Sequence, residues 1–105
     1  MPATDLLAAS GGQTYEGLFS FTATVDPASI GAVGAGNTTV TVPSGVTLLA
    51  TDTILAVPPA ALEAGVAVQG AYYASATTLT LRLTNASAGA IDPASATWTF
   101  IVLRK

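Results

Sequence analysis

The fold of this chain is decided by the stretch Thr78-Leu79-Thr80-Leu81-Arg82-Leu83-Thr84. Its three leucines alternate with threonine and arginine, which is the period of two of a β-strand with one buried face. The runs Leu18–Asp26 and Ala96–Leu103 alternate in the same way, with aromatic residues among the apolar positions. Three more runs are shorter or less regular: Asn37–Val42, Thr53–Val57 and Val66–Ala74. Segments so rich in Thr, Val and aromatic residues predict strands.

We therefore expect an all-β fold, a single-domain antiparallel β-sandwich or jelly-roll-like barrel of about six to eight strands over residues 17–105. Met1–Glu16 has no clear period and is expected to be an extended N-terminal arm or a first edge strand. Gly31–Gly36 is expected to be a flexible loop. The one segment expected to be helical is Pro59–Ala64, a single turn ending at Gly65.

The tetrapeptide Asp-Pro-Ala-Ser occurs twice, at Asp26–Ser29 and at Asp92–Ser95. Each copy lies beside a predicted strand. Asp-Pro favours a turn because proline fixes φ and the aspartate side chain can accept bonds from nearby backbone N–H groups. We expect two similar turns, with an internal repeat as the alternative.

The composition excludes several classes of protein. The chain has 105 residues, of which 50% are hydrophobic and 9% charged, with no cysteine and no histidine. Disulfides and Cys/His zinc sites are therefore excluded. Three basic against six acidic residues leave no basic face for nucleic acid. We expect no nucleic-acid partner, no membrane span, no secretion signal and synthesis in the cytoplasm.

The candidate chemistry is sparse. The acidic residues are scattered along the chain: Asp5, Glu16, Asp26, Asp52, Glu63 and Asp92. Most lie in predicted turns, where they are usually solvated, although folding could still pair two carboxylates or build a calcium site. No histidine is present to activate a serine. We expect a protein that is not an enzyme, with no catalytic residue, no metal site and no cofactor.

The aromatic residues and the strands that are apolar on both faces indicate a protein that associates with others through its surface rather than one with a catalytic site. Trp98 and Phe100 share a strand face and are expected to be core anchors, with a ligand platform as the alternative. Tyr72 and Tyr73 are adjacent, so a regular strand directs them to opposite faces. The strand Ala96–Leu103 is apolar on both faces near its end, and Val66–Ala74 is similar, with only Gln69 clearly polar. Such strands favour the centre of a sheet or a position beneath a partner. With so few charges, we expect a homo-oligomer.

The stretch Asn37 to Leu103 resembles a small module of phage virion proteins, found in tail-fibre tips and head-associated proteins. The similarity is carried, in order, by the segments Thr39–Pro43, Val57–Gly65, Leu79–Asn85 and Ala90–Trp98. On a chain of 105 residues, such a module resembles a capsid decoration (cement) protein. The resemblance carries over no catalytic residue.

The resemblance implies a homotrimer on the outer surface of the phage head, bound to the major capsid protein and reinforcing its subunit junctions. Residues 1–16 would be an arm lying against a neighbour. The residues expected at interfaces are Leu6, Leu7, Tyr15, Tyr73, Ile101 and Leu103. The alternatives are a tail or tail-fibre component, a carbohydrate-binding fibre tip, which needs exposed aromatic residues beside polar side chains, and, more remotely, a hydrolase.

Overall fold

The computed structural model describes residues 15–105, which form six strands. The strands agree with the six predicted runs to within a few residues at each end, because alternation of apolar and polar side chains specifies both the strand and its buried face. They are β1 (Gly17–Val25), β2 (Gly34–Thr41), β3 (Thr53–Val57), β4 (Val66–Tyr73), β5 (Thr78–Asn85) and β6 (Ala96–Arg104).

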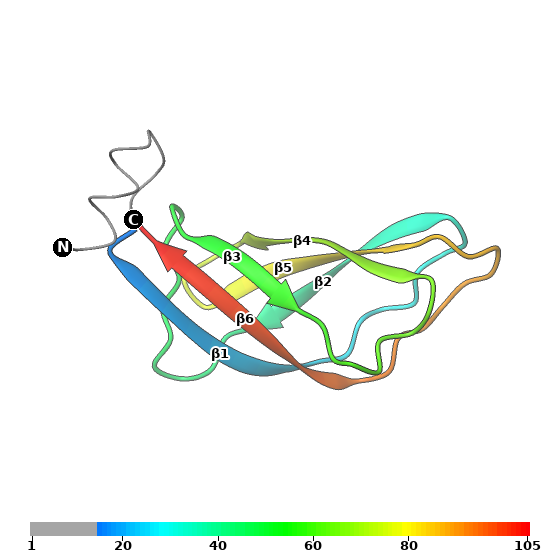
Figure 1. Ribbon diagram of the computed structural model, residues 1–105, viewed down its shortest axis with the longest axis horizontal. Coiled ribbons are helices and arrows are strands. Elements are labelled where there is room, and N and C mark those ends of the chain that lie inside the picture. Colours follow the sequence, from blue (N-terminus) through cyan, green and yellow to red (C-terminus); the bar gives the residue numbers. More distant parts are fainter. Residues whose placement is uncertain (1–14) are drawn as a thin grey trace.

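The strands form one antiparallel sheet in the order β1-β6-β3-β4-β5-β2. The sheet curls into a half-barrel, with β1, β6 and β3 nearer the viewer in Figure 1 and β5 and β2 behind them. The two halves are joined at β3 and β4 by a single residue pair, Ile54 with Ala71. The all-β prediction is confirmed, and the predicted sandwich or barrel takes the form of one curled sheet.

The hydrophobic core fills the inside of this curl. Each half of the sheet contributes the apolar side chains of one face, so that the alternating leucines of β5 meet the aromatic residues of β1 and β6. The fully apolar buried set is Phe21, Val25, Ile30, Val40, Val42, Leu48, Ile54, Val66, Leu79, Leu81, Leu83, Trp98, Phe100 and Val102.

Three aromatic rings form the centre of the front half. Phe100 stacks on Phe21 with ring centroids 5.5 Å apart and on Trp98 with centroids 6.5 Å apart. Trp98 is 1% exposed and Phe100 is fully buried. Both are therefore core anchors, as predicted, and neither offers a platform to a ligand.

A bulge in β4 changes which face its side chains occupy. The register with β5 shifts between Val68 and Gly70, which places Gly70 and Tyr72 on the outer side of the sheet, with Arg82. A Cβ atom on Gly70 would lie 2.5 Å from the Tyr72 hydroxyl oxygen, so this close approach requires glycine. Regular alternation, which would keep Gly70 and Tyr72 on the same side of the strand as Val66 and Val68, therefore stops at Val68.

The predicted helix at Pro59–Ala64 is wrong. The segment forms two successive turns, in which the Leu62 N–H donates to the Pro59 carbonyl and the Val66 N–H donates to the Glu63 carbonyl. Six residues are too few to offset the cost of nucleating a helix. Only the predicted end at Gly65 holds, since this glycine has a φ of +91°.

The predicted flexible loop Gly31–Gly36 is partly wrong. Gly34 and Gly36 belong to β2, where they pair with Asn85 and Leu83 of β5. Strand pairing to an alternating, strongly apolar neighbour overrides the weak strand propensity of glycine.

The two Asp-Pro-Ala-Ser segments face one another. β1 and β6 pair up to Val25 and Ala96, and the same register resumes at Ile30 and Ile91, which exchange backbone hydrogen bonds of 2.7 and 3.0 Å. Residues 26–29 and 92–95 span the gap between these two pairs. Proline has no N–H, so both strands lose their ladder at the same place. The segments are thus a matched interruption of one strand pair rather than two turns.

The Asn85 side chain ties two loops together at the end of β5: the β1–β2 loop and the β5–β6 loop. Its side chain is 1% exposed, and its Nδ2 donates to the carbonyls of Ile30 (3.1 Å), Gly31 (3.3 Å) and Gly89 (2.8 Å). Its Oδ1 accepts bonds from the Ser87 N–H (2.9 Å) and the Ser87 hydroxyl (2.7 Å). The Asn-Ala-Ser sequence, which has the form of a glycosylation site, therefore performs a structural task here.

Candidate functional site

The outer side of the front half of the sheet carries a continuous apolar surface. The ladder places Leu18 of β1 beside Leu103 of β6, and Ile101 of β6 beside Leu55 of β3. Val57 of β3 lies in the next row, opposite Thr99. We call this surface the apolar outer face, and its members are Leu18, Leu55, Val57, Ile101 and Leu103.

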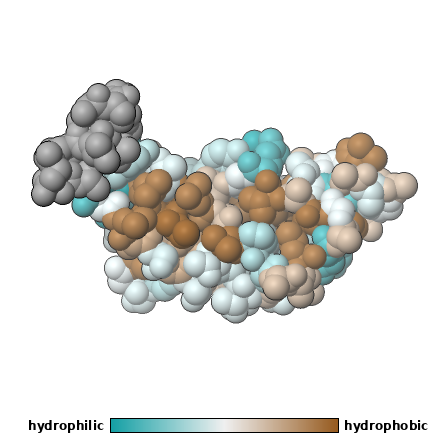
Figure 2. All heavy atoms as spheres, in the orientation of Figure 1, coloured by the Kyte–Doolittle hydropathy of each residue, from teal (hydrophilic) through white to brown (hydrophobic). Residues whose placement is uncertain are grey.

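The rest of this side of the sheet is uncharged. The remaining outward positions of β1, β6 and β3 are one serine and five threonines: Ser20, Thr22, Thr24, Thr53, Thr97 and Thr99. Leu18 is 71% exposed, Leu55 49% and Val57 44%. Figure 2 shows the brown, apolar residues gathered over this part of the molecule. A patch of this kind on a sheet face is typical of a surface that binds another protein.

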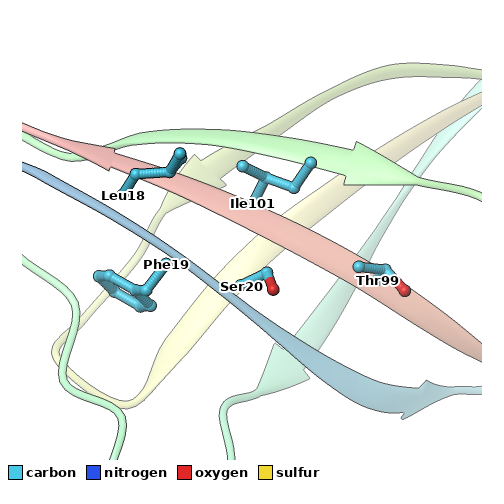
Figure 3. A pocket seen from close by; sticks show the side chains of 5 residues that line it. All are labelled: Leu18, Phe19, Ser20, Thr99 and Ile101. Atoms are coloured by element: carbon cyan, nitrogen blue, oxygen red, sulfur yellow. The ribbon is translucent and has the colours of Figure 1, made fainter.

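A shallow hollow marks the β1 side of this face. It has a volume of about 320 Å³ and is lined by Leu18, Phe19, Ser20, Thr99 and Ile101. Figure 3 shows Leu18 and Ile101 pointing to the same side of the strand pair, while Phe19 points away. The lining carries hydroxyl groups but no ionisable group, so the hollow suits an apolar side chain better than a charged ligand.

The structure brings together two of the predicted interface residues. Ile101 and Leu103 both belong to the apolar outer face. Tyr73 does not, because it pairs with Leu79 on the inner side of the sheet, where it is 38% exposed. Tyr15 is half-buried just before β1, and Leu6 and Leu7 lie outside the described residues.

The sequence prediction missed the other three members of the face, Leu18, Leu55 and Val57. Leu18 was hidden by the stronger apolar set of β1, which places phenylalanines on the inner face. Leu55 and Val57 lie in a five-residue apolar run whose faces cannot be distinguished by alternation. One signal in the sequence could have revealed Leu18. It occupies the side of β1 on which every other residue is a serine or a threonine, which marks it as an exposed apolar residue.

Away from the apolar outer face, an exposed apolar side chain lies at the tip of the β1–β2 loop. Val33 is 78% exposed and has a φ of +48°. This is the left-handed region, which a β-branched residue occupies at a cost of about 1–3 kcal/mol. The loop thus keeps a strained, solvent-facing valine that contributes nothing to the core.

Replacing Val33 by asparagine is expected to stabilise the protein by about 1 kcal/mol, because asparagine tolerates a positive φ. The midpoint of urea unfolding measures the gain. Ala32→Asn is the matched control in the same loop, at a position without positive φ, and should leave the midpoint nearly unchanged. An equal response of the two variants would contradict backbone strain at Val33.

The carboxylate with the most partners is structural. Asp52 accepts bonds from Arg104 Nε (2.9 Å) and Nη2 (2.7 Å), and from the Leu49 N–H (2.8 Å). Arg104 also donates to the Thr47 carbonyl and lies 5.0 Å from the centre of the Phe19 ring. The bonds from Arg104, helped by the Leu49 N–H, hold the pKa of Asp52 below its ordinary value. This contact ties the β2–β3 loop to the end of β6.

Acid is expected to weaken this tie. In the folded protein the lowered pKa of Asp52 means that its carboxyl binds fewer protons than in the unfolded chain. Its stabilisation is therefore complete above its unfolded pKa, about 4, and is lost as the pH falls through the lower, folded value. Asp52→Asn should lower the melting temperature by several degrees at pH 7 and flatten its decrease in acid.

Thermal unfolding followed from pH 7 to pH 2 checks this dependence. Asp26→Asn removes an exposed carboxylate and serves as the control. The role of Asp52 is contradicted if both variants retain the acid response of the unaltered protein.

The outer side of the rear half of the sheet is polar. Arg82 lies over the Tyr72 ring, 5.2 Å from its centre, and its Nε donates to Asn37 Oδ1 at 2.9 Å. Tyr72 is 44% exposed but packs across Gly70. The two outer sides of the sheet therefore differ in kind: the apolar outer face in front, and a threonine- and arginine-bearing surface behind.

The described acids do not assemble into a metal site. Within residues 15–105, no three acidic side chains gather closely enough to hold a metal ion. The same part of the chain has no helix with the length and apolar character needed to cross a bilayer.

Comparison with known proteins gives no relative. No protein-family model, curated protein or solved structure matches this chain. The resemblance to phage virion proteins therefore stays a prediction.

Proposed function

We propose that this protein is a structural component of a larger assembly, a capsid decoration protein that adheres to copies of itself and to the major capsid protein of a phage head. The observation that carries the proposal is the uncharged apolar outer face formed by β1, β6 and β3. Its virion setting comes from the resemblance of Asn37 to Leu103, which also implies a homotrimer.

The physics of the surface favours assembly over recognition of a small ligand. Burying exposed leucine and valine side chains stabilises a contact by about 25 cal/mol for each Å² of apolar area removed from water. Because the apolar outer face carries no charge, a contact between two copies at this face brings no like charges together, although each chain has a net charge of −3. Many copies on one shell would add up weak contacts by avidity.

A carbohydrate-binding fibre tip is supported less well. Tyr72 and Tyr73 are both exposed and line a hollow with the polar residues Asp52, Thr53 and Gln69. Of the two, Tyr72 is the more exposed, but Arg82 lies over its ring and its hydroxyl group approaches Gly70. A sugar stacking on this tyrosine would have to displace those contacts.

Immunolabelling of intact, purified phage particles tests the proposed location. Antibody raised against this chain should decorate the head, and the protein should sediment with particles in amounts comparable to the major capsid protein. Label confined to the tail would contradict a capsid location and favour the alternative of a tail or tail-fibre component. A protein absent from particles and found only free in the lysate would refute a virion role.

A further inference from the structure

Within the part of the chain that the structure describes, strand β1 is paired on one side only. It lies at the end of the sheet order and pairs only with β6. Among residues 15–105, the backbone hydrogen bonds of Gly17–Val25 all belong to that pairing. The other side of the strand thus presents a row of N–H and C=O groups that another strand can bind.

This edge lacks the features that usually prevent strand addition. All nine residues of β1 keep one register with β6, so no bulge twists the edge away. The strand contains no proline and no charged residue. The other edge strand, β2, opens with Gly-Ala-Gly-Asn, which has low strand propensity, and its Asn37 is already bonded to Arg82.

The exposure of Leu18 points to the same edge. Leu18 is the most exposed leucine of the apolar outer face, at 71%, whereas its ladder partner Leu103, on the central strand β6, is partly buried. Leu18 has a neighbouring strand on one side only. Leu103 has a neighbouring strand on both sides, β1 and β3. A further strand along the free edge of β1 would give Leu18 its second neighbour and cover its side chain in the same way.

We propose that β1 pairs antiparallel with β1 of a second copy, about a two-fold axis at Phe21. Two requirements select this register. Inner positions must meet inner positions, and all nine residues must be paired. Together they place Phe21 opposite its own copy. On either side of this Phe21 pair, large side chains meet smaller ones, with Phe19 opposite Ala23 and Leu18 opposite Thr24.

The pairing would join two half-sheets into one and bring the two apolar outer faces onto the same side. It deepens the proposed function, on whose self-association it rests, by naming the contact. A two-fold contact builds dimers, which departs from the homotrimer implied by the resemblance.

Cysteine cross-linking tests the register, because the natural chain contains no cysteine. Ser20 and Thr22 are exposed, and the register places each opposite the other in the second copy. In the double variant Ser20→Cys/Thr22→Cys, oxidation to disulfides should convert most of the protein to covalent dimer. Each single variant should cross-link far less, and Thr39→Cys/Thr41→Cys on the edge strand β2 should remain monomeric on denaturing gels.

A charge variant supplies an independent measurement. Thr22→Lys puts a positive charge at the edge near the proposed axis and should lower the average mass in solution, whereas Thr39→Lys on β2 should not. If the protein is an oligomer by light scattering but the double cysteine variant cross-links no better than the single variants, the strand pairing is overturned and self-association stands. If the unaltered protein is a monomer at every concentration, both fail.

The same experiment separates the other occupants of this edge. Thr22→Cys combined with a second cysteine placed in turn along residues 1–14 would, on oxidation, identify the N-terminal segment as the added strand. Disulfide formation between chains in Thr22→Cys/Thr39→Cys would reveal β1 against β2 of the next copy, as in a head-to-tail ring. Either result rejects the two-fold pairing.

Discussion

Phe100→Ala is expected to destabilise the protein by about 3–5 kcal/mol, the usual cost of truncating a fully buried phenylalanine. Phe100 is fully buried and stacks on both Phe21 and Trp98, so its removal leaves a cavity at the centre of the front half of the sheet. The free energy of unfolding of a typical domain is only about 5–15 kcal/mol, so the variant should lose a large fraction of its stability.

Urea unfolding followed by fluorescence measures this loss directly, because the single tryptophan, Trp98, is itself buried against Phe100. Val57→Ala, which shortens an exposed side chain, is the control and should stay within about 0.5 kcal/mol of the unaltered protein. Equal effects of the two variants would contradict the assignment of the core.

Asn85→Asp is expected to have a comparable effect, about 3–5 kcal/mol at pH 7, because it buries an unpaired negative charge. The new carboxylate would replace the Nδ2 donor and face the carbonyl oxygens of Ile30, Gly31 and Gly89. Burial and these carbonyls raise the pKa of the introduced carboxyl in the folded state. Its penalty is therefore present at neutral pH and diminishes in acid, where the protonated form can donate one hydrogen bond.

Denaturant midpoints of this variant at pH 7 and pH 4 give the comparison. Asn37→Asp makes the same chemical change at an exposed position, where the side chain only accepts a bond from Arg82. It should cost little at either pH. An Asn85→Asp variant that is as stable at pH 7 as at pH 4 would show that the amide donors of Asn85 do not hold the two loops together.

The strand framework could be predicted from the sequence because its main signal is local. The leucines of β5 and the aromatic residues of β6 alternate with polar residues, and this alternation identifies the buried face of each strand. The bulge at β4 could not be predicted, because it depends on the fit of Gly70 beneath Tyr72. The facing Asp-Pro-Ala-Ser segments were visible as a repeat, but their opposition follows from the pairing of strands far apart in sequence.

Only two of the five residues of the apolar outer face could be predicted, for the same reason. Ile101 and Leu103 stand out within one strand, whose two apolar faces predict a central position. Leu18 and Leu55 lie beside these two residues only because β1 and β3 flank β6 in the sheet, and this order could not be read from the sequence. Tyr73 does not belong to the apolar outer face, because it pairs with Leu79, whose side chain is buried on the inner side of the sheet.

The mass of the protein in solution tests the central claim most directly. Light scattering coupled to size-exclusion chromatography, over a range of concentrations, should give a multiple of the 10.4 kDa chain mass. Leu55→Lys, which places a charge at the middle of the apolar outer face, should lower the average mass, while Thr39→Lys should leave it unchanged. A unit mass of 10.4 kDa at every concentration for the unaltered protein would contradict the account.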